Sequence, residues 1–529
     1  MADKKFVDAD FVRVRSQPNS ERTAFHLYFG DEVVIESIQN GWTKIIAPAR
    51  ATQAGEAISG FVKGEVPVRA TAILKASMID VQQGDGMVLE TPSGKIILID
   101  GGDNQLFARH LAARFRARLT TRENPLPVEA IIVTHGDADH FAGLTEIRKS
   151  ETLTGSRQHK RVFIHPKRIL HNGIVKGPGN LAERAQLGAT VEDAQGKTFI
   201  TTLYEDIRQS PVAARNLPFK TWISTIDHWS QQHGPVEMRR AGLDKNPAQL
   251  FDFLQEDGIK IELHGPEVER VTPPGGQPVG GLRFLKEPPK TALLHELEQE
   301  DSGSLSASHT INGHSVAFRL NYGNVRFLFT GDLNKESMAR LEARLTQRDL
   351  EAEILKTPHH GSADFDLAFL RKVRPVVSLI SSGDESARKE YIHPRSTLMN
   401  ALGAASRNDT GLVFCTELTA FFEYRDACYT RDGLKKFFKN HTKTSFTKQE
   451  LEALFTGEAA GPSDGEPAFF AGFDRTQFGL IEIRTDGERV LIFTHSGKDE
   501  VFEAYRFLVK KTSNGRRTVT FADVVVRAG

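Results

Sequence analysis

The feature that most constrains this chain is residues 128–140, where an apolar run ends abruptly in four potential metal ligands. The run 128–133 is dense in Val, Ile and Ala, which is typical of a buried strand. His135, Asp137, Asp139 and His140 follow it directly. Two imidazoles and two carboxylates at the end of one strand can converge on a volume that holds one or two cations. A polar turn that caps the next helix is the alternative, since Asp is a good N-cap, but this density of ligands favours a metal site.

The motif Thr134-His-Gly-Asp-Ala-Asp-His140 resembles the His-x-His-x-Asp-His signature of the metallo-β-lactamase fold hydrolases, with Asp137 in place of the middle histidine. That variant is similar to the hydrolase domain of the DNA-uptake protein ComEC and its soluble relatives. Further segments match that family in the same order, namely residues 80–86, 96–102, 329–333 and 356–362. The resemblance covers roughly residues 70–410. It implies an α/β fold, the four-layer αββα metallo-β-lactamase sandwich, and a hydrolase.

The resemblance also implies a site for two divalent cations. His135 and Asp137 would hold one ion, Asp139 and His140 the other, and Asp332 would bridge them. Replacing a histidine by Asp137 makes the first site richer in oxygen, which shifts the preference from zinc toward manganese without excluding zinc. Asp139 is also a catalytic candidate.

Four histidines later in the chain are further candidates. We expect His359 and His360 to point opposite ways on an extended segment, with His360 binding metal and His359 facing substrate. His314 would serve the first metal or contact substrate. His393, in a His-Pro pair like one in the family, either protonates a leaving group or is a turn histidine on the surface. Asp100 either orients a metal-binding histidine or caps the helix expected at 105–118.

The pattern of turns and apolar runs predicts three regions. Residues 1–68 have short, evenly spaced strands, typical of a small β-barrel, and resemble bacterial Src-homology-3-like domains. Residues 69–410 form the hydrolase, with a largely helical insertion at about 150–300. Residues 411–529 are a C-terminal extension expected to pack on the hydrolase sheet, with a charged helix near 432–454 and a hairpin turning at Asp486-Gly487.

Composition limits the choice of partner and compartment. Lys plus Arg equals Asp plus Glu at 68 each, so no overall basic field attracts nucleic acid, although a local groove would suffice. Only Cys415 and Cys428 occur, which excludes a disulfide scaffold and a thiolate zinc cage. The chain begins without an apolar signal region and holds no apolar run of ~18 residues, so we expect a soluble, cytoplasmic protein that does not enter the membrane.

These observations favour hydrolysis by a water activated on two cations, zinc or manganese, with a phosphodiester as substrate. A nuclease and a phosphodiesterase both fit, and nucleic acid is among the candidate substrates. One alternative is a small-molecule ester or lactone hydrolase on the same fold. The other is a binding scaffold recruited through the N-terminal barrel, where Trp42 and Phe61 either line a groove for a peptide or protein partner or pack in the core.

Overall fold

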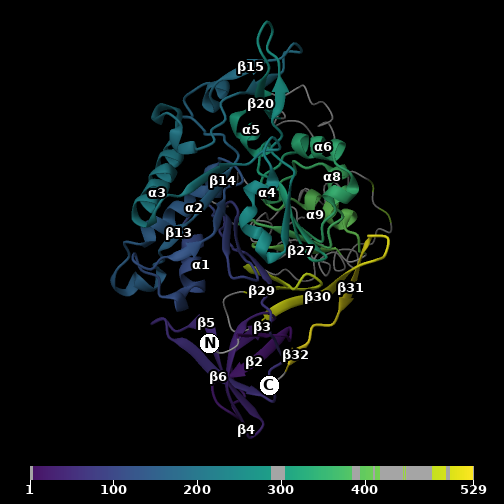
Figure 1. Cartoon of the computed structure of the whole chain (residues 1–529). Coiled ribbons are helices and arrows are strands. Elements are labelled where there is room, and N and C mark those ends of the chain that lie inside the picture. The colour runs from purple at the N-terminus through teal and green to yellow at the C-terminus, as the bar shows by residue number, and fades with distance from the viewer. Residues whose placement is uncertain are drawn as a thin grey trace.

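The computed structural model describes residues 4–287, 304–383, 393–408, 411–417, 479–495 and 501–527, with residues 445 and 447. It is a mixed α/β fold with two large sheets and many helices, and the N-terminal sheet lies at one end (Figure 1). The helix expected at 432–454 falls outside the described residues. None of the described helices is both long and apolar enough to span a bilayer.

Short strands near the N-terminus form one antiparallel sheet, consistent with a small half-barrel, in the order β3-β2-β6-β5-β4-β1-β7. A strand from the far end of the chain, β32, pairs with β2 in parallel. The strands are β1 (Lys5–Val7), β2 (Phe11–Arg15), β3 (Thr23–Tyr28), β4 (Glu32–Gln39), β5 (Trp42–Ala51), β6 (Ala57–Lys63), β7 (Val68–Arg69) and β32 (Val526–Arg527). Trp42 and Phe61 are half-buried in this sheet, and the Arg15 guanidinium lies 5.3 Å from the Trp42 ring centroid.

The first large sheet has ten strands in the order β17-β14-β12-β10-β9-β8-β28-β29-β30-β31. The C-terminal strands therefore extend this sheet edge to edge, because β28 pairs with β8. The expected hairpin at Asp486-Gly487 is confirmed by the pairing of β28 with β29. The strands are β8 (Leu74–Met78), β9 (Gly86–Glu90), β10 (Ile96–Asp100), β12 (Ala130–Ile132), β14 (Arg168–His171), β17 (Glu237–Arg240), β28 (Leu480–Thr485), β29 (Arg489–His495), β30 (Val501–Lys511) and β31 (Arg517–Ala522).

The second large sheet has six strands in the order β18-β23-β24-β25-β26-β27. The hairpin expected around residues 322–324 is present, and its first strand begins at Phe318 because residues 307–313 form a helix. The strands are β18 (Ile259–Leu263), β23 (Phe318–Tyr322), β24 (Val325–Phe329), β25 (Ile354–Lys356), β26 (Val377–Ile380) and β27 (Leu412–Cys415).

In the middle of the first sheet, at β10, both faces are buried. On β10, Ile97 and Ile99 pack into a core shared with the second sheet, whereas Ile96 and Leu98 pack against helices on the other face. This alternation follows from the two-residue period of a strand. A third apolar core joins the second sheet to its own helices. The helices are α1 (Leu106–Arg114), α2 (Ala138–Ser150), α3 (Leu217–His233), α4 (Pro247–Leu250), α5 (Ala307–Gly313), α6 (Lys335–Arg344), α7 (Gln347–Leu350), α8 (Leu367–Val373) and α9 (Ser396–Ala405).

The insertion differs from the expectation of a largely helical segment. Its described part holds one long helix, α3, and several short strands, including a four-stranded sheet in the order β15-β16-β20-β19. Gly, Pro and polar residues in the insertion form turns between short strands. Strands of only a few residues leave too short a pattern to be recognised in the sequence. The remaining short strands, within the insertion or just outside it, are β11 (Leu126–Val128), β13 (Ile164–Pro166), β15 (Thr190–Glu192), β16 (Thr198–Ile200), β19 (Glu269–Val271), β20 (Val279–Arg283), β21 (Lys286–Glu287) and β22 (Ser304–Leu305).

Candidate metal centre

The carboxyl ends of strands from both large sheets meet at one edge of the core. Strands β10, β12 and β14 run parallel in the first sheet, and β24, β25 and β26 run parallel in the second. Asp100 is the last residue of β10, and the loops after β12, β24 and β25 carry His135, Asp332 and His360. Because β9 runs antiparallel to β10 and Gly86 pairs with Asp100, Asp85 enters at the same edge. Polar residues from distant parts of the sequence are thereby brought to one place.

Four of these side chains form a buried group that could hold a metal ion. In Asp85, His140, Asp332 and His360, one ligand atom of each residue lies within 4.8 Å of the others. His140 Nε2 lies 3.2 Å from His360 Nε2 and 3.2 Å from Asp332 Oδ2, and His360 Nε2 lies 2.9 Å from the same oxygen. Two imidazole nitrogens and a carboxylate oxygen facing one another suit a shared cation.

The orientation of His140 is set by a hydrogen-bond network behind it. Asp100 Oδ2 lies 2.9 Å from His140 Nδ1, and the Asp100 carboxylate also accepts from the backbone N–H and hydroxyl of Thr134, at 2.8 and 2.7 Å. A carboxylate on Nδ1 favours the tautomer whose Nε2 lone pair is free for a metal. Helix α1 takes Gln105 as its N-cap, so Asp100 supports His140 and does not cap that helix.

A buried lysine compensates the negative charge of the group. Lys356 Nζ contacts Asp85, lies 3.7 Å from Asp332 Oδ1 and donates to the Gly331 carbonyl at 3.0 Å. Burial would raise the pKa of Asp85, but Lys356 and His360 together lower it. Burial would lower the pKa of His360, yet Asp332 and Asp85 raise it to about 10. These cationic partners show how much negative charge the pocket carries.

The remaining ligand candidates from the central motif lie beside this group. Asp139, in the first turn of α2, places Oδ2 3.6 Å from His360 Nε2. His135 is buried with its ring centroid 3.9 Å from that of His140. Asp137 is the N-cap of α2 and points one oxygen at Lys176 Nζ, 2.6 Å away. Burial is the main cause that lowers the pKa of His135 and raises that of Asp137.

Of the four later histidines, only His360 lies in the metal-ligand group. His359 and His360 were expected on an extended segment, but they lie in a 3-10 turn and both have positive φ. The ring centroid of His359 lies 6.2 Å from that of His393. Burial lowers the pKa of His393 to about 3. His314 is not brought to the group, because its Nε2 donates to the Arg283 carbonyl at 2.7 Å, and burial lowers its pKa to about 4.

Three residues at or beside the metal-ligand group were not among the candidates predicted from the sequence. Asp85 belongs to the motif 80–86, but nothing in the sequence showed that its side chain lies beside His140, in the loop and helix start more than fifty residues later. Lys356 lies just before the His-His pair, where a buried apolar strand made a charged side chain unexpected. Asn312, at the end of α5, approaches both His135 and Asp137. For Asp85 and Lys356, a charged residue directly beside a buried strand was the available signal.

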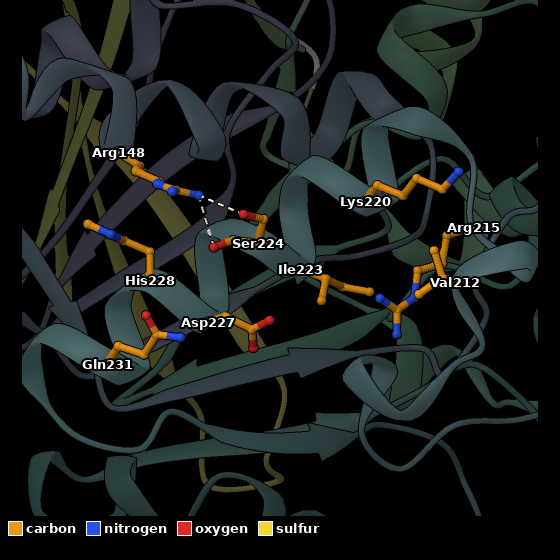
Figure 2. A pocket seen from close by; sticks show the side chains of 9 residues that line it. All are labelled: Arg148, Val212, Arg215, Lys220, Ile223, Ser224, Asp227, His228 and Gln231. Carbon is orange, nitrogen blue, oxygen red and sulfur yellow. Dashed lines mark hydrogen bonds between the residues drawn. The ribbon is translucent and has the colours of Figure 1, made fainter.

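A separate pocket of about 490 Å³ lies between α2 and α3 (Figure 2). Its lining includes Arg148, Arg215, Lys220 and Asp227, and Arg148 donates to the carbonyl and hydroxyl oxygens of Ser224 at 3.0 and 2.9 Å. None of the residues of the metal-ligand group lines it. Arg148 lies near the opposite end of α2 from the ligands, about 12 Å along the helix axis.

Comparisons with known proteins agree with the fold of the central region. Residues 79–205 match the family model of the Metallo-beta-lactamase superfamily, so this part of the chain carries a domain of that superfamily. None of the curated proteins compared with the chain matches it.

Two solved structures are similar at low identity. A diphosphatase from the PhnP family is 14% identical, with a TM-score of 0.21, over 60% of this chain and 92% of that one. A long form RNase Z from yeast is 7% identical, with a TM-score of 0.25; the match covers 82% of this chain and 49% of the RNase Z chain. At these TM-scores neither match supports a statement about this chain. The resemblances to ComEC and to Src-homology-3-like domains stay predictions.

Proposed function

We propose that this protein is a metal-dependent hydrolase that cleaves a phosphodiester, as a nuclease or phosphodiesterase, on a four-layer αββα scaffold. The observation that carries the proposal is the buried convergence of Asp85, His140, Asp332 and His360. Within the described part of the chain, Asp332 Oδ1 accepts no hydrogen bond although it is buried. In the same part of the chain, its charge is compensated only by Lys356 Nζ at 3.7 Å, and a metal cation beside the two facing imidazoles would complete that compensation, so the donor set fits one.

Each residue has a defined task in this proposal. His140, His360 and Asp139 would hold one ion, His135 and Asp137 would hold the other, and Asp332 would serve both. Two divalent cations, zinc or manganese, would lower the pKa of a shared water and stabilise both the attacking and the leaving oxygen. Asp100 keeps His140 in the ligating tautomer.

Other groups act on the substrate. Helix α2 begins at the ligand loop without a side-chain cap, and the positive end of its dipole favours an anionic phosphate there. His359 lies beside the ligand His360, and His393 lies beside His359; one of the two would protonate the leaving oxygen. Lys356 holds Asp85 in place by charge compensation.

The test is turnover of single-stranded DNA, RNA and a chromogenic phosphodiester with Mn²⁺ or Zn²⁺, by the wild-type chain and the Asp332→Asn variant. We expect wild-type cleavage of at least one substrate that is abolished by a chelator and by the substitution. Cleavage only of an ester or lactone would replace the phosphodiester by that substrate class. No turnover together with no metal binding would overturn the proposal and leave a binding scaffold, with a peptide or protein partner for the N-terminal sheet.

A further inference from the structure

The side chain of Asn312 occupies the space between His135 and Asp137. Asn312 lies next to the last residue of α5, and one terminal atom of its amide lies 3.0 Å from Asp137 Oδ2, 3.3 Å from His135 Nε2 and 3.1 Å from the Ser308 carbonyl oxygen. All three neighbours are hydrogen-bond acceptors when His135 carries its proton on Nδ1. His135 Nδ1 has oxygen partners for that proton, the hydroxyls of Thr134 and Ser315 at 3.1 and 3.4 Å.

The amide can satisfy this environment in two orientations. With its nitrogen turned inward, Asn312 donates to Asp137, Ser308 and His135. With its oxygen turned inward, the amide nitrogen instead lies 3.5 Å from His359 Nε2, and the inner space is surrounded only by lone pairs. When His135 carries its proton on Nδ1 and Asp137 is ionised, a cation makes that second arrangement favourable, because a cluster of acceptors otherwise repels.

The spacing of these atoms fits a small divalent ion. Ligands that lie about 2.1 Å from an ion are about 3.0 Å apart in an octahedron, and at about 2.0 Å they are about 3.3 Å apart in a tetrahedron. The separations of 3.0 and 3.3 Å from Asn312 to Asp137 and His135 fall within this range. Lys176 neutralises the outer oxygen of Asp137 at 2.6 Å, as ligating carboxylates commonly bind a further group, and leaves Oδ2 facing inward.

We propose that the amide oxygen of Asn312 is the third ligand that belongs to this cation alone, beside His135 and Asp137 and in addition to the bridging Asp332. The inference rests on the two-cation centre proposed above and specifies its second half. One imidazole nitrogen and two oxygens form a harder donor set than the pair His140 and His360, so this half prefers Mn²⁺ over Zn²⁺. The chain would then carry two unequal sites, one rich in nitrogen and one rich in oxygen.

The test is the number and affinity of Mn²⁺ ions bound by the full-length metal-free chain, measured by calorimetry and by metal analysis after dialysis. Asn312→Leu removes the oxygen at nearly constant volume, and we expect it to lose one of two ions or to bind it more than about 100-fold more weakly, beyond the loss usual for groups that only orient a ligand. Asn312→Asp keeps an oxygen but removes the N–H donor, so we expect it to retain both ions. Asn321→Leu on β23 is the matched control, because Asn321 bonds only to Lys260 and Glu262 in the described structure.

Each result decides a different claim. Two ions with unchanged affinity in Asn312→Leu, or loss of one ion in Asn312→Asp as well, would overturn the role of Asn312 and leave the two-cation hydrolase standing. A wild-type chain that binds no Mn²⁺ or Zn²⁺ would overturn the proposed function and this inference together. Circular dichroism of the metal-free variants checks that each is folded, and Asn312→Asp carries the test if Asn312→Leu is not.

Discussion

The carboxylate of Asp100 should control metal binding although it lies behind the ligands. Replacing Asp100 by Asn leaves one oxygen, which can still accept from the Thr134 backbone, and puts an NH₂ group where Oδ2 faces His140 Nδ1. That NH₂ group donates to Nδ1, so the proton of His140 moves to Nε2. A protonated Nε2 cannot ligate a cation, and the ligand is lost without any change in its position.

The size of the effect follows from what Asp100 contributes. Loss of a group that orients a ligating histidine typically weakens metal binding 10–100-fold, or about 1.4–2.7 kcal/mol. We expect Asp100→Asn to reach the upper end, because the substitution both removes the charge and selects the wrong tautomer. Calorimetric titration of the metal-free protein with Zn²⁺ measures the affinity. The ¹⁵N chemical shifts of His140 measure which ring nitrogen carries the proton.

Asp252→Asn is the matched control, since Asp252 forms an ion pair with Arg239 at the surface. We expect this control to bind Zn²⁺ as the wild type does. Wild-type affinity in Asp100→Asn, with the variant folded, would refute the argument that Asp100 sets the tautomer of His140.

Three further substitutions test the packing around the centre. Lys356→Met leaves the buried Asp85 with His360 but without its lysine, so the metal-free protein should lose about 3 kcal/mol of unfolding free energy in urea titration, and added Mn²⁺ should restore part of it. In Gly84→Ala the new Cβ would lie 1.7 Å from the Asp139 carbonyl oxygen at a φ of +91°, so the loop must shift and cation affinity should fall at least about tenfold. His171 accepts a backbone N–H on Nδ1, and burial lowers its pKa from 6.5 to about 4. The unfolded chain therefore binds more protons between these values, and wild-type stability should fall as pH drops from 6.5 to 4, whereas His171→Asn should lose less.

Each of these expectations has a result that would contradict it. Lys356→Met with wild-type stability in the absence of metal would show that Asp85 is protonated when its partner is gone. Unchanged titration of Gly84→Ala would show that the loop yields without moving Asp139. Equal pH dependence of wild type and His171→Asn, followed by thermal unfolding, would place the acid-sensitive group elsewhere.

Local chemistry was sufficient for the parts of the fold that depend on neighbouring residues. The buried strand before Thr134, the hairpins at 322–324 and at Asp486-Gly487 and the N-terminal antiparallel strands follow from strand periodicity and turn residues. The insertion was misjudged because its strands are only a few residues long and are held by pairing with distant segments. Such pairing overrides weak local preferences.

The conformation of the two adjacent histidines, His359 and His360, was also not predictable from the local sequence. An extended segment would alternate His359 and His360, but positive φ angles at both residues turn the chain after β25. His360 lies in the metal-ligand group because of this turn, and not because side chains alternate along an extended strand. Backbone conformations of this kind depend on the surrounding structure, which must stabilise the strain.

By itself, the sequence determined that a buried strand ends in a dense set of imidazoles and carboxylates, since ligand type and strand pattern are local properties. Only the tertiary structure decided which of those ligands face one another, that Asp85, Lys356 and Asn312 join them, and that His314 does not. Those choices depend on the edge where two sheets meet, and the residues that meet there are separated by up to 275 positions, from Asp85 to His360. No local pattern encodes a contact across that separation, because it arises only when buried apolar faces of both sheets pack together.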